Sequence, residues 1–82
     1  MNDEYISIMT ERIVRVFDPL QIILFGSQAR GDAERQSDID LLVVFSELTD
    51  KRKTAIDILR ALSDLSISTA LVEHGYRVEK DL

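Results

Sequence analysis

The sequence predicts a small α/β (α+β) domain in which a mixed sheet of about three strands is flanked by two main helices. Apolar residues recur at helical spacing in two segments, and continuous apolar runs typical of buried strands lie between and after them. A chain of 82 residues is long enough for one domain and too short for two. We therefore expect residues 1–82 to form a single domain, with a polar tail over residues 73–82.

The first predicted helix covers residues 4–17 and ends before Pro19, because the residue preceding a proline disfavours helical conformation. The second begins at Thr49 or Asp50, either of which can cap its N-terminus, and continues to about Leu62. The apolar residues that repeat at helical spacing, and that we expect to face the core, are Ile6, Met9, Ile13, Phe17, Ala55, Ile58, Leu59 and Leu62. Strands are expected over residues 21–25 and 38–45 and, more weakly, over residues 66–73.

Two aspartates, Asp38 and Asp40, stand at the start of the second predicted strand. Residues two apart in a strand point to the same face and lie about 6–7 Å apart along the chain. Mg²⁺ favours carboxylate oxygens together with substrate phosphates, and paired metal ions stabilise the attacking and leaving oxygens of a displacement. The pattern predicts a Mg²⁺ (or Mn²⁺) site at these carboxylates, with Ile39 pointing the other way, into the core.

The turn after the first strand has the composition of an anion-binding turn. Gly26 allows close approach of the backbone to a ligand, and Ser27 is a good N-cap for about one helical turn that Gly31 ends. The start of a helix exposes unpaired N–H groups that suit phosphate oxygens, and Arg30 adds a permanent positive charge. These residues predict binding of a triphosphate.

Residues 26–31 (Gly-Ser-Gln-Ala-Arg-Gly) and 37–43 (Ser-Asp-Ile-Asp-Leu-Leu-Val) together resemble the signature of the minimal nucleotidyltransferases of the DNA polymerase β superfamily. The resemblance extends over residues 10–72 and implies a small nucleotidyltransferase fold. It also implies that a nucleoside monophosphate is transferred from a Mg²⁺-bound nucleoside triphosphate, ATP, with release of pyrophosphate. Many members resemble the antitoxin half of a two-gene toxin–antitoxin module, whose partner is a HEPN-type ribonuclease that the antitoxin can adenylylate.

By this resemblance, the triphosphate would be held by Gly26 and Ser27, with Arg30 and Ser37 beside them. The catalytic and metal-binding residues would be Asp38 and Asp40.

The family pattern also includes a third carboxylate on a later strand, where it serves as base or metal ligand. In this chain the corresponding position is occupied by Thr69 or Ala70, neither of which is a carboxylate. Asp64 and Asp81 lack the expected strand context, so the best substitute is Glu73.

Charge and composition limit the partners. The net charge of −5 argues against direct nucleic-acid binding, which needs clustered Lys and Arg, and the basic run over residues 51–53 is interpreted as a solvated face. No apolar stretch approaches the length of a membrane span. The absence of cysteine suits a cytoplasmic protein, and the small size makes a homo-oligomer or a partner chain plausible.

Two functions therefore stay open. The first is an enzyme that transfers AMP from Mg²⁺-ATP to a hydroxyl, on a partner protein. The second is an antitoxin with an incomplete active site, which neutralises its toxin by binding alone. The missing third carboxylate favours the second, whereas the intact Gly26-Ser27 turn and the paired Asp38 and Asp40 favour the first.

Overall fold

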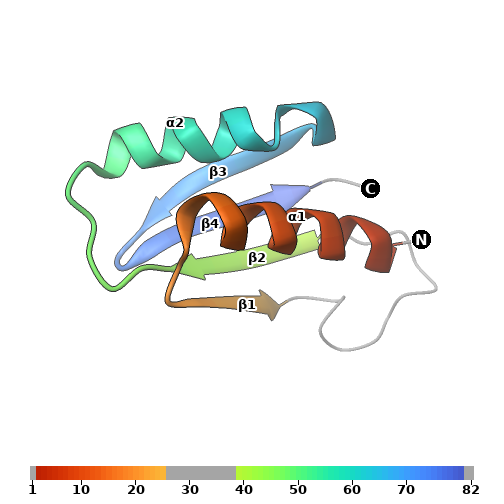
Figure 1. Cartoon of the computed structure of the whole chain (residues 1–82), viewed down its shortest axis with the longest axis horizontal. Helices are drawn as coiled ribbons and strands as arrows, with labels where there is room; N and C mark the ends of the chain where they lie inside the picture. The colour runs from red at the N-terminus through yellow and green to blue at the C-terminus, as the bar shows by residue number, and fades with distance from the viewer. Residues whose placement is uncertain (1, 26–38, 81–82) are drawn as a thin grey trace.

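The computed structural model describes residues 2–25 and 39–80, which form two α-helices, a short 3-10 helix and four strands (Figure 1). In chain order these elements are α1 (Asn2–Phe17), β1 (Gln21–Phe25), β2 (Ile39–Val44), α2 (Lys51–Ala61), η1 (Ser63–Leu65), β3 (Ile67–Val72) and β4 (Gly75–Lys80). Both predicted helices and all three predicted strands are confirmed to within about two residues at each end. As expected, Asp50 caps α2, its side chain accepting a hydrogen bond from the backbone N–H of Lys53.

The strands form one sheet in the order β1-β2-β4-β3, and every neighbouring pair in it is antiparallel. The α+β class is therefore confirmed, but the expected mixed sheet of about three strands is wrong, because the described sheet has four strands and is antiparallel. The extra strand, β4, lies in residues 73–82, where a polar tail was expected. Buried and exposed residues alternate in β4, which explains why the segment was not predicted as a strand: Tyr76 and Val78 are fully buried, while Arg77 between them is exposed.

The strand β4 begins at a glycine because its backbone passes very close to β2. A Cβ atom built on Gly75 would lie 1.8 Å from the carbonyl oxygen of Val43, so no larger residue fits without moving backbone. The turn between β3 and β4 is two residues long, Glu73 and His74, and it leads directly into the pairing of Gly75 with Val72 and with Val44.

The molecule has two layers, with α1 and α2 on one face of the sheet (Figure 1). The core lies between the layers, and its buried residues are Met9, Ile13, Ile39, Leu41, Val43, Ala55, Ile58, Leu62, Leu65, Tyr76 and Val78. Leu59, which was expected in the core, is 39% exposed. None of the helices described lies on the opposite face of the sheet, which carries the even-numbered residues of β2.

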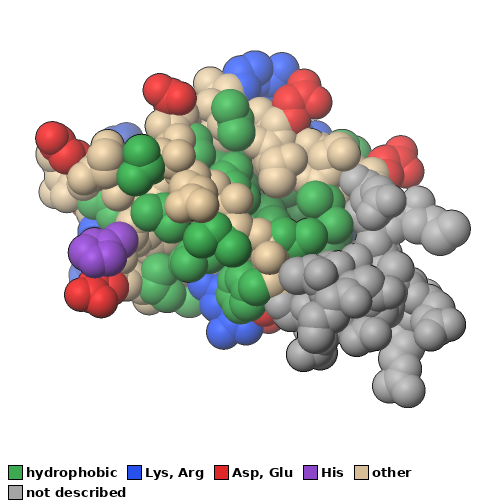
Figure 2. Space-filling model, turned by 90° about the horizontal axis from the view of Figure 1, so that it is seen from below, with side chains coloured by type: hydrophobic (Ala, Val, Ile, Leu, Met, Phe, Trp, Pro, Cys, Tyr) green, Lys and Arg blue, Asp and Glu red, His purple; other side chains and the backbone are tan. Residues whose placement is uncertain are grey.

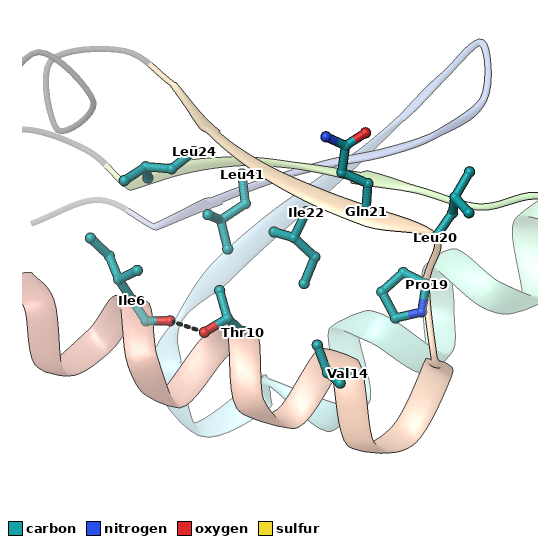
Figure 3. Close-up of a pocket in the computed structure, with 9 residues that line it drawn as sticks. All are labelled: Ile6, Thr10, Val14, Pro19, Leu20, Gln21, Ile22, Leu24 and Leu41. Carbon is teal, nitrogen blue, oxygen red and sulfur yellow. Dashed lines mark hydrogen bonds between the residues drawn. The ribbon is translucent and has the colours of Figure 1, made fainter.

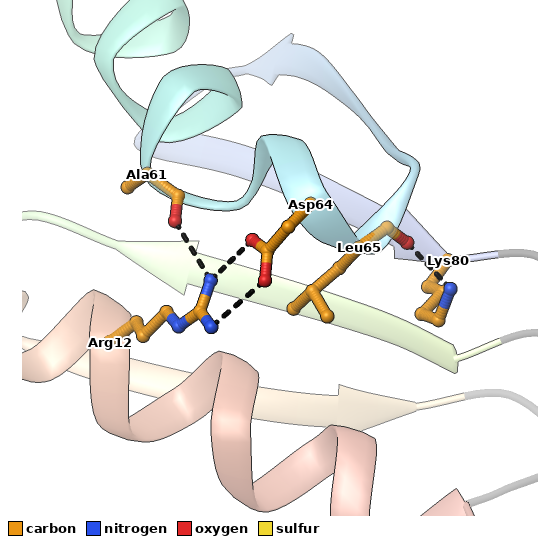
Figure 4. A network of polar contacts seen from close by, with 5 residues as sticks. All are labelled: Arg12, Ala61, Asp64, Leu65 and Lys80. Carbon is orange, nitrogen blue, oxygen red and sulfur yellow. Dashed lines mark hydrogen bonds and ion pairs between the residues drawn. The ribbon is translucent and has the colours of Figure 1, made fainter.

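Polar contacts join the first helix to the end of the second (Figure 4). The guanidinium of Arg12 donates to both carboxylate oxygens of Asp64, at 2.6 and 3.1 Å, and to the carbonyl oxygen of Ala61 at 3.2 Å. Next to this network, the buried Lys80 ammonium donates to the carbonyl oxygen of Leu65. Neither of the two α-helices described is long and apolar enough to cross a membrane.

Candidate functional site

One of the predicted site residues, Asp40, lies in the part of the chain that the structure describes. Its neighbours in β2, Ile39 and Leu41, are fully buried in the core, so Asp40 points to the face of the sheet opposite the helices. This orientation of Ile39 and Asp40 is the one that the sequence predicted. The predicted residues that lie outside the described part, and whose roles stay predictions, are Gly26, Ser27, Arg30, Ser37 and Asp38.

Asp40 belongs to a row of four residues that crosses the sheet from one edge to the other. Phe25 of β1 pairs with Asp40, Asp40 pairs with Glu79 of β4, and Glu79 pairs with Ser68 of β3. Directly opposed residues on antiparallel strands have Cβ atoms about 4.5–5.5 Å apart. Two carboxylates that are far apart in the sequence therefore face the same side of the sheet as direct neighbours.

An arginine from the next row lies against this pair and offsets part of its negative charge. Arg77 Nε donates to Asp40 Oδ1 at 2.9 Å and Arg77 Nη2 donates to Asp40 Oδ2 at 2.7 Å, while Arg77 Nε lies 3.7 Å from Glu79 Oε1. The guanidinium carbon also lies 5.4 Å from the centroid of the Phe25 ring. The hydrogen bonds to Asp40, and then its charge, raise the pKa of Arg77 above its ordinary value. The guanidinium is therefore held as a cation against the carboxylates.

The structure places Glu73 and Glu79 at different distances from Asp40. Glu73, chosen from the sequence, lies in the turn before Gly75, which pairs with Val44 at the far end of β2. That end lies four positions along β2 from Asp40, a distance of about 13 Å. Glu79 instead lies directly beside Asp40. The signal that could have found it is the alternation of buried and polar residues over 75–80, after the glycine turn.

The donor atoms at this place suit a hard divalent cation. Mg²⁺ binds to one or two carboxylates and completes its octahedral shell with phosphate oxygens and waters. Asp40 and Glu79 provide carboxylate oxygens of that kind, with side chains that are 12% and 34% exposed. Within residues 2–25 and 39–80, no group of three or more His, Cys, Asp or Glu is placed to hold a metal ion. The described residues therefore fit part of a Mg²⁺ site, which Asp38 would complete by the sequence prediction.

A second surface feature, a groove of about 400 Å³ between α1 and β1, lies on the other side of the sheet (Figure 3). Leu41 lines this groove, so its neighbour Asp40 faces away from it. Figure 2 shows apolar side chains gathered on the side of the molecule that carries β1. Two apolar residues that line the groove, Val14 and Leu20, are exposed. The groove is lined by apolar and neutral polar residues, and the carboxylates of the candidate site lie outside it.

Comparison with known proteins identifies the family. The model of the nucleotidyltransferase domain matches residues 6–82, which is nearly all of the sequence. The chain belongs to the nucleotidyltransferase domain family. Its small α+β fold, with two helices and an antiparallel sheet, is consistent with that family. The general function of nucleotidyl transfer that the motif implied is supported as well.

Two curated relatives come from Methanocaldococcus jannaschii, and both are named "Putative protein adenylyltransferase". The first is 41% identical over 63 residues, covering 68% of this chain and 43% of the relative. The second is 49% identical over 37 residues, covering 44% of this chain and 37% of the relative. The chain thus spans less than half the length of these relatives. No solved structure matches the chain.

Proposed function

We propose that this nucleotidyltransferase domain transfers AMP from Mg²⁺-ATP to a hydroxyl group of a partner protein. The observation that carries the proposal is the pairing of Asp40 with Glu79 on the open face of the sheet. Asp40 also pairs with Phe25, the last described residue before residues 26–38. Those residues carry the predicted triphosphate turn and Asp38. The names of the two relatives support a protein as the acceptor.

In this proposal, Asp38 and Asp40 would hold Mg²⁺, which would supply positive charge to the triphosphate, and Gly26 and Ser27 would hold the phosphates. The oxygen of the acceptor hydroxyl forms a bond to the α-phosphorus, and the bond from that phosphorus to the pyrophosphate oxygen breaks. Glu79 accepts the hydroxyl proton or completes the metal ligands, which is the role of the third carboxylate.

We propose further that the acceptor is a HEPN-type toxin and that the domain acts as its antitoxin in the cytoplasm. This part of the proposal comes from the resemblance of residues 26–31 and 37–43 to the minimal nucleotidyltransferases. The acidic balance of the chain, −5, suits a basic partner surface, because complementary charges steer association.

The test is transfer of labelled AMP from α-labelled ATP to a purified HEPN protein in the presence of Mg²⁺. Asp40→Asn should abolish labelling, because an amide is a poor ligand for Mg²⁺. Asp57→Asn is the matched control: it makes the same charge change on α2, where Asp57 pairs with Lys53 at 2.9 Å. Labelling that survives Asp40→Asn, or that is equally lost in Asp57→Asn, would contradict the proposal.

One observation favours the second candidate, an antitoxin that neutralises by binding alone. Both carboxylate oxygens of Asp40 accept hydrogen bonds from Arg77. If binding alone neutralises the toxin, Asp40→Asn should leave neutralisation of toxin ribonuclease activity intact. Neutralisation that requires ATP, and that is lost in Asp40→Asn, would favour the enzyme.

A further inference from the structure

The contact between Arg77 and Asp40 engages the whole carboxylate group. Its two hydrogen bonds, of 2.9 and 2.7 Å, use both oxygens, and the Asp40 side chain is only 12% exposed. Arg77 also has two other neighbours, the carboxylate of Glu79 and the ring of Phe25. It can therefore leave Asp40 and still be held nearby by a charge and by an aromatic face.

The position of Arg77 has an electrostatic reason. Like charges directly opposite each other on paired strands destabilise a sheet, and Asp40 and Glu79 are such a pair. The guanidinium lies against both carboxylates and offsets their repulsion. A divalent cation bound between the same carboxylates would also offset their repulsion, because it too supplies positive charge at that place.

Arg77 and the metal cannot both hold Asp40 in the geometry seen here. Each carboxylate oxygen keeps a second lone pair, but a cation placed there would lie a few ångströms from the guanidinium. At such distances the repulsion between a divalent ion and a unit positive charge is large even when solvent screens it. Metal binding therefore favours release of at least one of the two hydrogen bonds.

We propose that Arg77 is the resident counter-ion of the metal site: it holds the Asp40 carboxylate beside Glu79 through both oxygens and competes with the divalent cation for that carboxylate. On binding of the cation, the guanidinium leaves Asp40 and stays between Glu79 and Phe25. This inference deepens the proposed function and rests on it, because it requires a divalent cation at Asp40.

The test measures the affinity for Mn²⁺ without any substrate, by the electron paramagnetic resonance signal of the free ion. Arg77→Gln removes the competing charge and should bind Mn²⁺ about tenfold more tightly than wild type, the factor expected for loss of one charge-assisted contact. Arg77→Lys keeps the charge but cannot form the two-pronged contact, so its affinity should lie in between. Arg60→Gln changes an exposed arginine of α2 by the same charge and should bind as wild type does.

A second readout uses the wild-type protein and so does not depend on how a variant folds. The Nε–H resonance of Arg77, assigned by its absence in Arg77→Lys, should shift when diamagnetic Mg²⁺ is added. Mg²⁺ binding that leaves this resonance unchanged would overturn the inference.

The failure of this inference differs from the failure of the proposed function. If wild type binds Mn²⁺, Asp40→Asn does not, and Arg77→Gln binds equally or more weakly, the competition is wrong while the metal site stands. If neither wild type nor Arg77→Gln shows binding that depends on Asp40, the proposed metal site is wrong and the inference falls with it.

Discussion

A single pairing between strands decides which carboxylates can act together. Asp40 and Glu79 are separated by most of the second half of the chain, yet they are direct neighbours because β2 and β4 pair antiparallel in this register. Glu73, which is closer to the expected position in the sequence, lies beyond the other end of that pairing. The role of an acidic side chain is therefore set by its register position and not by its distance along the sequence.

The two glutamates make a matched test of this argument. Glu79→Gln should lower kcat/KM for labelled AMP transfer by about a hundredfold or more, the loss expected for a general base or metal-ligating carboxylate. Glu73→Gln makes the same chemical change on a side chain that is 88% exposed, and it should leave the rate unchanged. Equal losses in the two variants would show that Glu79 has no special role.

The ion pair between Arg12 and Asp64 makes the stability depend on acid pH. Its hydrogen bonds lower the pKa of Asp64, so the folded state binds fewer protons than the unfolded chain at acid pH. This contribution is present above the unfolded pKa of about 3.9 and is lost as the pH falls through the lower folded pKa. Asp64→Asn lacks it, so the stabilities of wild type and variant should converge from pH 5 to pH 2.

The measurement is the urea midpoint across this pH range, at low salt and at 1 M NaCl. Because Arg12 and Asp64 are both solvent-accessible, the difference should be small and should shrink at high salt. If the urea midpoints of wild type and Asp64→Asn differ by the same amount from pH 5 to pH 2, the pH dependence does not come from this ion pair.

At the scale of elements, helices and apolar strands could be read from the sequence, but β4 could not. The helices and the first two strands have one dominant pattern each, and burial follows it at Met9, Ile13 and Ile58. In β4 the charged residues Arg77 and Glu79 alternate with the buried ones, so the segment looked like a polar tail. The charges are accommodated because they pair across strands, and that pairing is not visible in a local pattern.

The same limit applies to the candidate site. The motif predicted that Asp40 and Ile39 would face opposite sides of the sheet, and the structure confirms it. It could not predict Glu79 or Arg77, because their proximity to Asp40 depends on the strand order β1-β2-β4-β3. Short motifs therefore located the strand that carries the candidate site, while tertiary pairing selected the residues around Asp40.

One hydrogen bond attaches β4 to the start of α2, and it gives a prediction for this pair of elements. The buried Tyr76 hydroxyl donates to the carbonyl oxygen of Lys51 at 2.7 Å. Tyr76→Phe should lower the free energy of unfolding by about 1 kcal/mol, because it removes this hydrogen bond from a buried site. Tyr5→Phe removes a hydroxyl from an exposed residue and should change the stability by less than about 0.5 kcal/mol.

The pH dependence separates the buried hydroxyl from a general packing effect. Burial raises the pKa of Tyr76, so the folded state keeps a proton that the unfolded chain loses above about pH 10. Wild type should therefore lose stability as the pH rises above 10, and Tyr76→Phe should lose less. Urea midpoints between pH 9 and pH 11 measure this, and an equal loss in both proteins would show that Tyr76 is not responsible.

For the whole molecule, the two layers leave the face of the sheet that carries the candidate site without a described helix. The helices bury one side of the sheet, which supplies the core, and Asp40, Arg77 and Glu79 all lie on the other side. A ligand can therefore bind to this face without displacing the core, and its binding energy adds to the stability of the fold.

This coupling predicts that Mg²⁺ stabilises the folded chain through Asp40. At ten times the dissociation constant, a ligand that binds only the native state adds about 1.4 kcal/mol, which raises the Tm of a domain of this size by about 5–10 °C. The rise should be absent in Asp40→Asn. In Arg77→Gln it should reach half its maximum at a lower Mg²⁺ concentration than in wild type, since no guanidinium competes for the carboxylate.

Screening of the net charge of −5 could also raise the Tm, so NaCl at matched ionic strength is the control. Thermal unfolding followed by circular dichroism measures the Tm of wild type, Asp40→Asn and Arg77→Gln, each with Mg²⁺ and with the NaCl control. A Mg²⁺-dependent rise that is equal in wild type and Asp40→Asn would mean that the ion acts through the general charge of the molecule. A rise that requires Asp40, and that occurs at a lower Mg²⁺ concentration in Arg77→Gln, would show that folding stability is coupled to cation binding at Asp40 and that Arg77 competes with the cation.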